Sequence, residues 1–365
     1  MIKRTGVAIL IVLFAMTLPA AAQSARQTEN VVLISLDGMR WQEVFSGADP
    51  VLIRNDDFVS DTTHLKAAFW NDDVATRRRQ LMPFFWEHIA VNGQLYGDRA
   101  AGSMVDVTNT MRFSYPGYNE ILTGFADPRI DSNAKRPNHN TTVLEAAIRT
   151  PGLAGKVAAF GSWDVFPFII NEVRSGVPVN AGFEHAGGTR LTDRERFLNE
   201  LQDQIPSPWS SVRLDAFTHH YALEYLQRER PRLLYIAYGE TDDFAHDGAY
   251  DHYLHAAHRT DAFIRELYTW VQSDPGYRDK TTFIITTDHG RGTVPIGAWR
   301  SHGDDVRGAE QIWLAIFGPD TPGRAPETLK GQWFQNQVAS TVAAFLGITY
   351  TNDPAPGAPV LEAMK

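Results

Sequence analysis

Short runs of hydrophobic residues recur along the chain, and most of them end at a glycine or an aspartate. The runs cover residues 30–36, 156–160, 233–238, 282–287 and 312–317. Continuous hydrophobicity over so few residues, without alternation, is typical of strands that are buried on both faces of a parallel sheet. The runs therefore predict the strands of a mostly parallel sheet.

The segments between these runs carry hydrophobic residues at helical spacing. Helices are predicted over residues 142–149, 211–228, 256–272 and 333–346. Strands that alternate with helices indicate an α/β fold with helices on both faces of the sheet. Residues 48–80 are predicted to be irregular and to cap the site, and residues 151–210, rich in Gly, Pro and Asn, to form loops and a small insertion.

The N-terminal segment has the pattern of a secretory signal peptide. Lys3 and Arg4 precede a hydrophobic run over residues 7–18, and residues 20–22 are all alanine. A basic start, a short hydrophobic core and small residues at the end are what signal peptidase reads. The run is shorter than the roughly 20 residues that span a bilayer. We therefore predict a signal peptide over 1–22, one catalytic domain over 23–365, and an exported protein, periplasmic or extracellular, without stable membrane insertion.

Composition narrows the classes of function. The 365 residues include 34 Lys+Arg against 43 Asp+Glu, a net charge of −9. A protein that binds nucleic acid through its phosphates is usually basic, so this class is disfavoured. The chain has no cysteine, which excludes disulfides, thiolate metal sites and a cysteine nucleophile. The oligomeric state is left open.

Acidic residues and histidines follow three of the predicted strands. They are three carboxylates and three imidazoles: Asp37, Asp242, His246, Asp288, His289 and His302. The carboxyl ends of parallel strands meet at one edge of a sheet, so we expect these side chains to converge. Mixed oxygen and nitrogen ligands suit zinc, which is favoured, or manganese, and there are enough for two divalent ions. Two adjacent ions are suited to phosphoryl transfer.

The segment from Arg112 to Gly124 contains a candidate nucleophile, Ser114. Ser114 precedes a Pro-Gly turn signal, and a helix is expected to begin near Glu120. The free N–H groups at a helix start face anions, and a serine oxygen beside a metal ion is an activated nucleophile. Arg112 and Arg300 are candidate partners of a substrate oxyanion, with an ion pair inside the protein as an equally good interpretation.

The motifs LISLDG, FSYPGYNEILTG, GETDDFAHDG, TTDHG and SHGD, in this order, resemble the alkaline phosphatase superfamily, which also contains sulfatases and phosphoglyceromutases. The type I phosphodiesterase/nucleotide pyrophosphatase branch is the most similar. The resemblance implies an alkaline-phosphatase-like three-layer sandwich and a phosphoseryl intermediate on Ser114, a ligand shared by two metal sites. It implies that the first site consists of Asp242, His246 and His302, and the second of Asp37, Asp288 and His289.

The chain departs from the family pattern near the nucleophile. Phosphodiesterases of this branch usually have T-x-P-N, where this chain has Ser114 and Gly117, and either Asn119 or Asn133 is a candidate for the asparagine that binds a substrate oxygen. The Lys-x-Arg pair of some monoesterases is absent after Phe160.

The prediction is a hydrolase of small phosphoric esters, with a diester or nucleotide-like substrate favoured over a monoester. Three alternatives remain on the same scaffold: a phosphoryl transferase or mutase, a sulfuric-ester hydrolase, and a non-catalytic binder of metal ions or anions.

Overall fold

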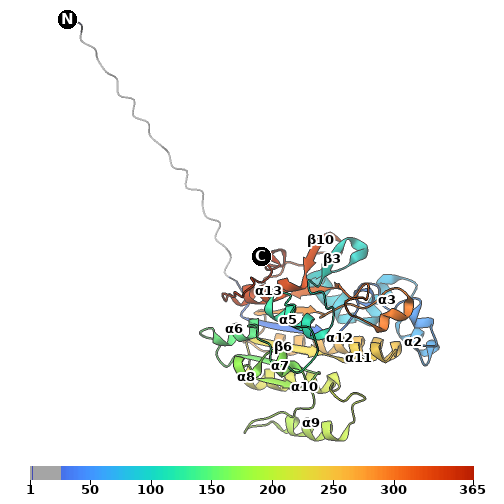
Figure 1. Ribbon diagram of the computed structural model, residues 1–365, viewed down its shortest axis with the longest axis horizontal. Helices are drawn as coiled ribbons and strands as arrows, with labels where there is room; N and C mark the ends of the chain where they lie inside the picture. The colour runs from blue at the N-terminus through green and yellow to red at the C-terminus, as the bar shows by residue number, and fades with distance from the viewer. Residues whose placement is uncertain (1, 3–25) are drawn as a thin grey trace.

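The computed structural model describes residue 2 and residues 26–365, so the predicted signal peptide lies, apart from residue 2, outside the described residues. A seven-stranded sheet forms the centre of the molecule (Figure 1). In spatial order its strands are β2 (Gly93–Tyr96), β9 (Leu314–Phe317), β7 (Thr281–Thr286), β1 (Asn30–Leu36), β6 (Leu233–Tyr238), β4 (Val157–Gly161) and β5 (Val179–Ala181). The pairings of β9 with β2 and with β7 are antiparallel and all other pairings in this sheet are parallel, which confirms a mostly parallel sheet.

Four of the predicted strands form within one residue of their expected bounds, but the single strand predicted over 312–317 was wrong. The chain leaves the ladder at Trp313, whose indole is fully buried and donates a hydrogen bond to the Met39 carbonyl at 2.9 Å. Before it, β8 (Gln311–Ile312) joins β3 (Ser103–Asp106) and β10 (Gly331–Phe334) in a small second sheet. One buried anchor thus divides the hydrophobic run between two sheets.

Both faces of the central sheet are covered by helices, which confirms the predicted layers. Alternate residues of β1 belong to two separate hydrophobic clusters, Val32 and Ile34 to one and Val31 and Leu33 to the other. Helices α10 (Asp215–Glu229) and α12 (Tyr250–Ser273) pack into the first cluster. Helices α5 (Ser114–Thr123), α6 (Val143–Arg149) and α13 (Val338–Leu346) pack into the second. Burial on both faces explains why the strand sequences do not alternate.

Two regions predicted to be irregular contain helices. Residues 48–80 form η1 (Leu52–Arg54), α2 (Thr62–Phe69) and α3 (Val74–Leu81). Residues 151–210 include α7 (Phe166–Ile169), α8 (Glu172–Ser175) and α9 (Asp193–Gln204), and α9 packs on the outer side of α10 (Figure 1). Thr192 and Glu195 form a capping box at the start of α9, a sequence signal of a helix start that the prediction missed.

Three predicted helices begin at other residues than expected. Helix α10 begins at Asp215 rather than at 211, α12 begins at Tyr250 rather than at 256, and residues 331–334 form β10 before α13. The remaining short helices are α1 (Trp41–Ser46), η2 (Phe85–Ile89), α4 (Ala90–Asn92), η3 (Arg99–Ala101), α11 (Glu240–His246), η4 (Ile296–Arg300), η5 (Pro326–Thr328), η6 (Gln335–Gln337) and η7 (Leu361–Ala363). Among the described helices, none combines the length and hydrophobicity that crossing a bilayer requires.

Candidate active site

The strand register brings the predicted ligands to one edge of the sheet. Leu36 of β1 pairs with Tyr238 of β6, and Ser35 pairs with Thr286 of β7, so the three strands end side by side. Asp37 follows β1, α11 begins two residues after β6, and Asp288 follows β7. The convergence expected at the carboxyl ends of parallel strands is therefore present.

Asp37, Asp288 and His289 form one buried group. The His289 Nε2 atom lies 3.3 Å from Asp37 Oδ1 and 3.5 Å from Asp288 Oδ2, and none of these three atoms has a hydrogen-bond partner among the described residues. The other ring nitrogen of His289 donates to the Gly290 carbonyl at 2.9 Å, which leaves a lone pair on Nε2. Three electron-rich atoms facing one another in a buried site are what a cation requires.

Asp242, His246 and His302 form a second group beside the first. His246 Nε2 lies 3.2 Å from Asp242 Oδ2 and 2.9 Å from His302 Nε2. His302 donates from Nδ1 to the Arg112 carbonyl at 3.2 Å, so its Nε2 also offers a lone pair. The two groups adjoin, because His289 Nε2 is 3.7 Å from Asp242 Oδ1. The imidazole ring of His289 also stacks on that of His302, with 3.9 Å between the ring centroids.

The carboxylates of the Asp37, Asp288 and His289 group are unfavourably placed without a cation. Burial, followed by repulsion from Asp242, raises the pKa of Asp37 well above its ordinary value. Burial and then Asp37 do the same to the pKa of Asp288. Burial, followed by His289, lowers the pKa of His302 to about 2. These carboxyl groups therefore resist ionising together, and a divalent ion between them would remove this penalty.

The donor set fits divalent metal ions. Two overlapping sets of three carboxylate and imidazole atoms lie close enough to share an ion: Asp37, Asp288 and His289 form one, and Asp242, His289 and His302 form the other. His246 adjoins the second set through Asp242 and His302, and the chain has no thiolate. Three protein ligands with a further open position are typical of catalytic zinc sites. Manganese accepts the same nitrogen and oxygen ligands.

Ser114 is the first residue of α5, so this helix begins six residues earlier than predicted. Three contacts place this end of α5 against the two groups. The Arg112 carbonyl accepts from His302 as described, Gly117 packs against the Asp288 backbone, and Tyr118 Oη donates to Asp37 Oδ2 at 2.9 Å. Ser114 is therefore the first residue of the helix end that faces both groups, and free N–H groups at such a helix N-terminus favour an anion.

The close approach of α5 explains the glycine that departs from the T-x-P-N pattern. A Cβ atom on Gly117 would lie 2.3 Å from the Asp288 carbonyl oxygen and 3.1 Å from the Asp288 Cβ. Any side chain at this position would push the helix away from the strand end. The glycine at 117 is therefore required by packing.

The structure separates the two candidate asparagines. Asn119 is fully buried, and its Oδ1 accepts from the side chains of Asn138 and Asn140, each at 3.1 Å. It organises the loop after α5 and is not brought to Ser114. Asn133 Oδ1 accepts from the Tyr115 N–H at 3.0 Å, next to Ser114, and its amide nitrogen has no partner among the described side chains and backbone groups.

The two candidate arginines lie at the rim. Arg112 adopts a left-handed backbone conformation with φ of 54°, and its guanidinium contacts the Asp304 carbonyl at 3.3 Å and Glu310 at 3.5 Å. Arg300 donates to the His246 carbonyl at 3.2 Å. Both side chains therefore contact protein groups near the ligands.

The sequence prediction missed several residues that hold the ligands. Besides Tyr118, Thr241 Oγ1 donates to the Asp37 carbonyl at 2.5 Å, and Gln335 Nε2 donates to the Asp288 carbonyl at 2.7 Å. Arg291 contacts Asp242. Tyr118 lies one helical turn after Ser114, and Arg291 directly follows the TTDHG motif. Their closeness in sequence to predicted site residues was the signal that could have identified both. Nothing in the sequence marked Gln335, which is distant in the chain.

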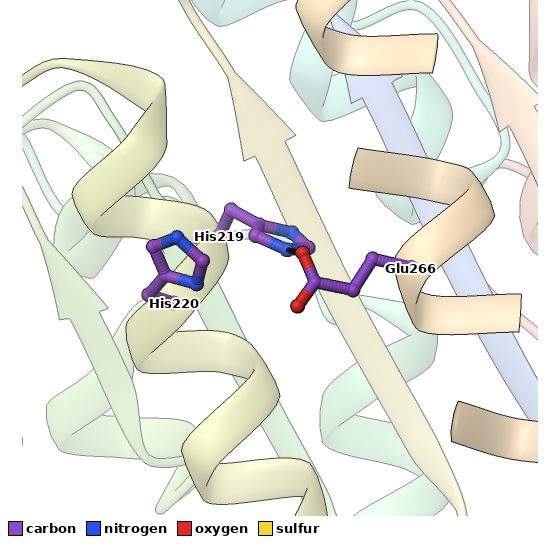
Figure 2. A group of neighbouring side chains, drawn as sticks. All are labelled: His219, His220 and Glu266. Carbon is purple, nitrogen blue, oxygen red and sulfur yellow. Dashed lines mark hydrogen bonds and ion pairs between the residues drawn. The ribbon is translucent and has the colours of Figure 1, made fainter. Parts of the chain in front are cut away.

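A separate group of His219, His220 and Glu266 lies between α10 and α12 (Figure 2). His219 is fully buried, and both its ring nitrogens have partners: Nε2 pairs with Glu266 at 3.0 Å and Nδ1 with the Tyr238 hydroxyl at 3.1 Å. Arg194 donates to His220 Nδ1 at 3.1 Å. These hydrogen bonds, together with a neighbouring guanidinium, explain the group without an ion.

A mostly parallel sheet, clustered carboxylates and imidazoles at its edge and a serine at a helix start form the arrangement expected of a metal-dependent ester hydrolase. Residues 53–307, more than half of the chain, match the model of the family described as type I phosphodiesterase / nucleotide pyrophosphatase. The chain belongs to this family, which hydrolyses phosphate esters. The matched segment includes Ser114 and five of the six candidate metal ligands but not Asp37.

Solved structures share the fold at low sequence identity. The wild-type alkaline phosphatase PafA is 9% identical with a TM-score of 0.60, covering 94% of this chain and 100% of its own. The phosphonate monoester hydrolase SpPMH from Silicibacter pomeroyi is 14% identical with a TM-score of 0.55, covering 92% and 76%. BT1596, a 2-O GAG sulfatase, is 12% identical with a TM-score of 0.55, covering 93% and 75%. A search of curated proteins found no match.

Proposed function

We propose that this protein is an exported, two-metal-dependent hydrolase of phosphoric esters that attacks its substrate with Ser114 and prefers diesters. The observation that carries the proposal is the set of buried, unpartnered ligand atoms of Asp37, Asp288 and His289 against the first turn of α5. Buried polar atoms without partners are rare in folded proteins and usually serve a ligand or a reaction.

Two sets of residues would hold the ions. Asp242, His246 and His302 would bind one ion, and Asp37, Asp288 and His289 the other. When bound, two divalent ions, zinc in our proposal, supply positive charge that polarises the phosphoryl group and stabilises the attacking and leaving oxygens.

The chain's own residues account for the remaining chemistry. Ser114 Oγ forms a bond to phosphorus while the bond from phosphorus to the leaving oxygen breaks, and the proton that Ser114 gives up leaves with that oxygen as an alcohol. A water molecule then attacks the phosphorylated Ser114: its oxygen bonds to phosphorus, the bond between phosphorus and Ser114 breaks, one water proton returns to Ser114 Oγ, and the other is released with the product phosphate. The N–H groups at the start of α5 and the free amide nitrogen of Asn133 bind the non-bridging oxygens, where charge increases in the transition state.

The preference for a diester rests on the charges near the strand ends. A monoester carries one more negative charge than a diester and needs additional cations. At the end of β4, the chain reads Gly161-Ser162-Trp163-Asp164, and Ser162 is buried and donates a hydrogen bond from its hydroxyl to Asp215 Oδ1 at 2.6 Å. The nearby Lys135 is neutralised by Asp164 at 2.6 Å. This loop therefore offers no free cation for a dianion.

The test compares p-nitrophenyl phosphate, bis-p-nitrophenyl phosphate and p-nitrophenyl sulfate as substrates of purified, metal-quantified protein. We expect the diester to be preferred and S114A to lower its turnover by about 10³-fold or more, as removal of a covalent nucleophile does. S114T, which keeps a hydroxyl, is the matched control and should retain part of the turnover. A preference for the monoester or sulfate would refute the substrate assignment, and undiminished turnover by S114A would refute the nucleophile.

A further inference from the structure

Arg291 is a buried cation beside the candidate metal ligands. It follows the motif that contains Asp288 and His289, and only 1% of its surface is exposed. Its Nε donates to the Gly38 carbonyl at 3.2 Å, and its Nη2 donates both to the Asp242 carbonyl at 3.0 Å and to the Asp242 carboxylate. The side chain therefore fixes Asp242 through both its backbone and its carboxylate.

Gly38 links this arginine to the other ligand group. Its N–H donates to Asp288 Oδ1 at 3.0 Å, while its carbonyl accepts from Arg291. Gly38 has φ of +58°, and a Cβ atom there would lie 2.7 Å from Asp242 Oδ1 and 2.9 Å from Arg291 Nε. Only glycine leaves space for the guanidinium, so this residue and Arg291 form one arrangement.

We propose that Arg291 is a positioning residue of the metal centre. It binds Asp242 and the Gly38 backbone, and because Gly38 also binds Asp288, it holds Asp242 at a fixed distance from the Asp37, Asp288 and His289 group. The inference rests on the two-ion site of the proposed function. Carboxylates that bind metal ions are commonly oriented by hydrogen bonds from residues that do not touch the metal, and loss of such a partner typically weakens metal binding.

The shape of the contact favours orientation over charge alone. A guanidinium is a rigid planar fork, and here its Nε and Nη2 reach two different residues, which a lysine nitrogen cannot do in the same geometry. Its Nη1 is buried without a partner among the described residues. Leaving a buried donor unpaired is unfavourable. The hydrogen bonds of Nε and Nη2 must therefore outweigh this cost and keep the guanidinium in place.

The opposite interpretation is that Arg291 merely takes the place of an ion near Asp242 in the metal-free protein. The two interpretations predict opposite signs. If Arg291 only occupies the place of an ion, its removal frees the Asp242 carboxylate and tightens metal binding. If it orients the carboxylate, its removal weakens binding of the ion held by Asp242, His246 and His302 and leaves the other ion largely unaffected.

The experiment measures zinc stoichiometry and affinity on the full chain, by metal analysis and by titration against a chromophoric chelator. The variants are R291M and R291K, with R278M as the matched control, because Arg278 is exposed in the turn before β7. We expect wild type and R278M to bind two ions, and R291M to bind one of them 10- to 100-fold more weakly. R291K keeps the buried charge, so it remains informative should R291M fail to fold, and we expect it to recover only part of the affinity.

The outcomes distinguish a failure of this inference from a failure of the proposed function on which it rests. Equal or tighter zinc binding by R291M, or full affinity in R291K, would overturn the positioning role while the two-ion hydrolase stands. Absence of zinc binding by the wild-type protein would overturn both.

Discussion

Replacing Gly117 by alanine tests how closely α5 must approach the ligands. The added Cβ would lie 2.3 Å from the Asp288 carbonyl oxygen, whereas an ordinary contact requires at least 3.4 Å, so the helix or the strand end must move by about 1 Å. The atoms that it meets belong to the backbone and Cβ of Asp288, which cannot turn away. The movement falls on a predicted metal ligand and on Ser114, three residues earlier in the helix.

The expected effects on activity and stability differ in size. A misplacement of about 1 Å in an active site can lower the rate by about 100-fold. Overpacking costs about 1–3 kcal/mol of the free energy of unfolding, but alanine in a helix recovers up to about 1 kcal/mol relative to glycine. We therefore expect G117A to lower kcat/KM for the diester by about 100-fold while the free energy of unfolding falls by no more than about 2 kcal/mol.

The assay pairs diester hydrolysis with urea unfolding of the same samples. The matched control is G187A, because a Cβ atom on Gly187 would meet no atom within 4 Å. This control should leave both quantities unchanged. Activity of G117A within about twofold of wild type would refute the close packing of α5 on Asp288 as the reason for this glycine.

Three further predictions follow from individual contacts. Y118F removes the hydrogen bond to Asp37 and should weaken zinc binding by about tenfold with little loss of stability, measured by chelator competition; unchanged affinity would contradict it. Burial, followed by repulsion from His219 and Arg194, lowers the pKa of His220 from 6.5 to about 4. The unfolded chain therefore binds a proton at higher pH than the folded protein, and folding stability that is present above pH 6.5 is lost as the pH falls towards 4. H220Q should lack this loss, about 1–2 kcal/mol after allowance for solvent screening, in urea unfolding at pH 7.5 and 4.5, and identical pH profiles would refute it. Removal of metal with a chelator should abolish turnover and lower the melting temperature, and added zinc should restore both; a metal-free protein with full activity would contradict the site.

Features encoded in contiguous residues could be predicted from the sequence. The run from Asn30 to Leu36 is hydrophobic at every position because both faces of β1 are covered, and this pattern is visible without a structure. Asp37 and Asp288 could be placed at one edge because they directly follow such runs. The direction and alignment of parallel strands then bring them together.

Features that depend on distant packing could not be predicted. The need for glycine at 117 follows from the contact between α5 and Asp288, which lies far along the chain. The partners of Arg291 and Gln335 were hidden for the same reason. The sequence does not distinguish Asn119 from Asn133 as the candidate substrate-binding asparagine. Only the folded loop shows that Asn133 adjoins Ser114.

The most direct test of the central claim is mass spectrometry of protein quenched in acid during turnover of bis-p-nitrophenyl phosphate. The account predicts a nitrophenyl-phosphoryl adduct on the peptide that contains Ser114, present in zinc-loaded protein and absent after metal removal. Steady turnover without an adduct, or an adduct on another peptide, would contradict it.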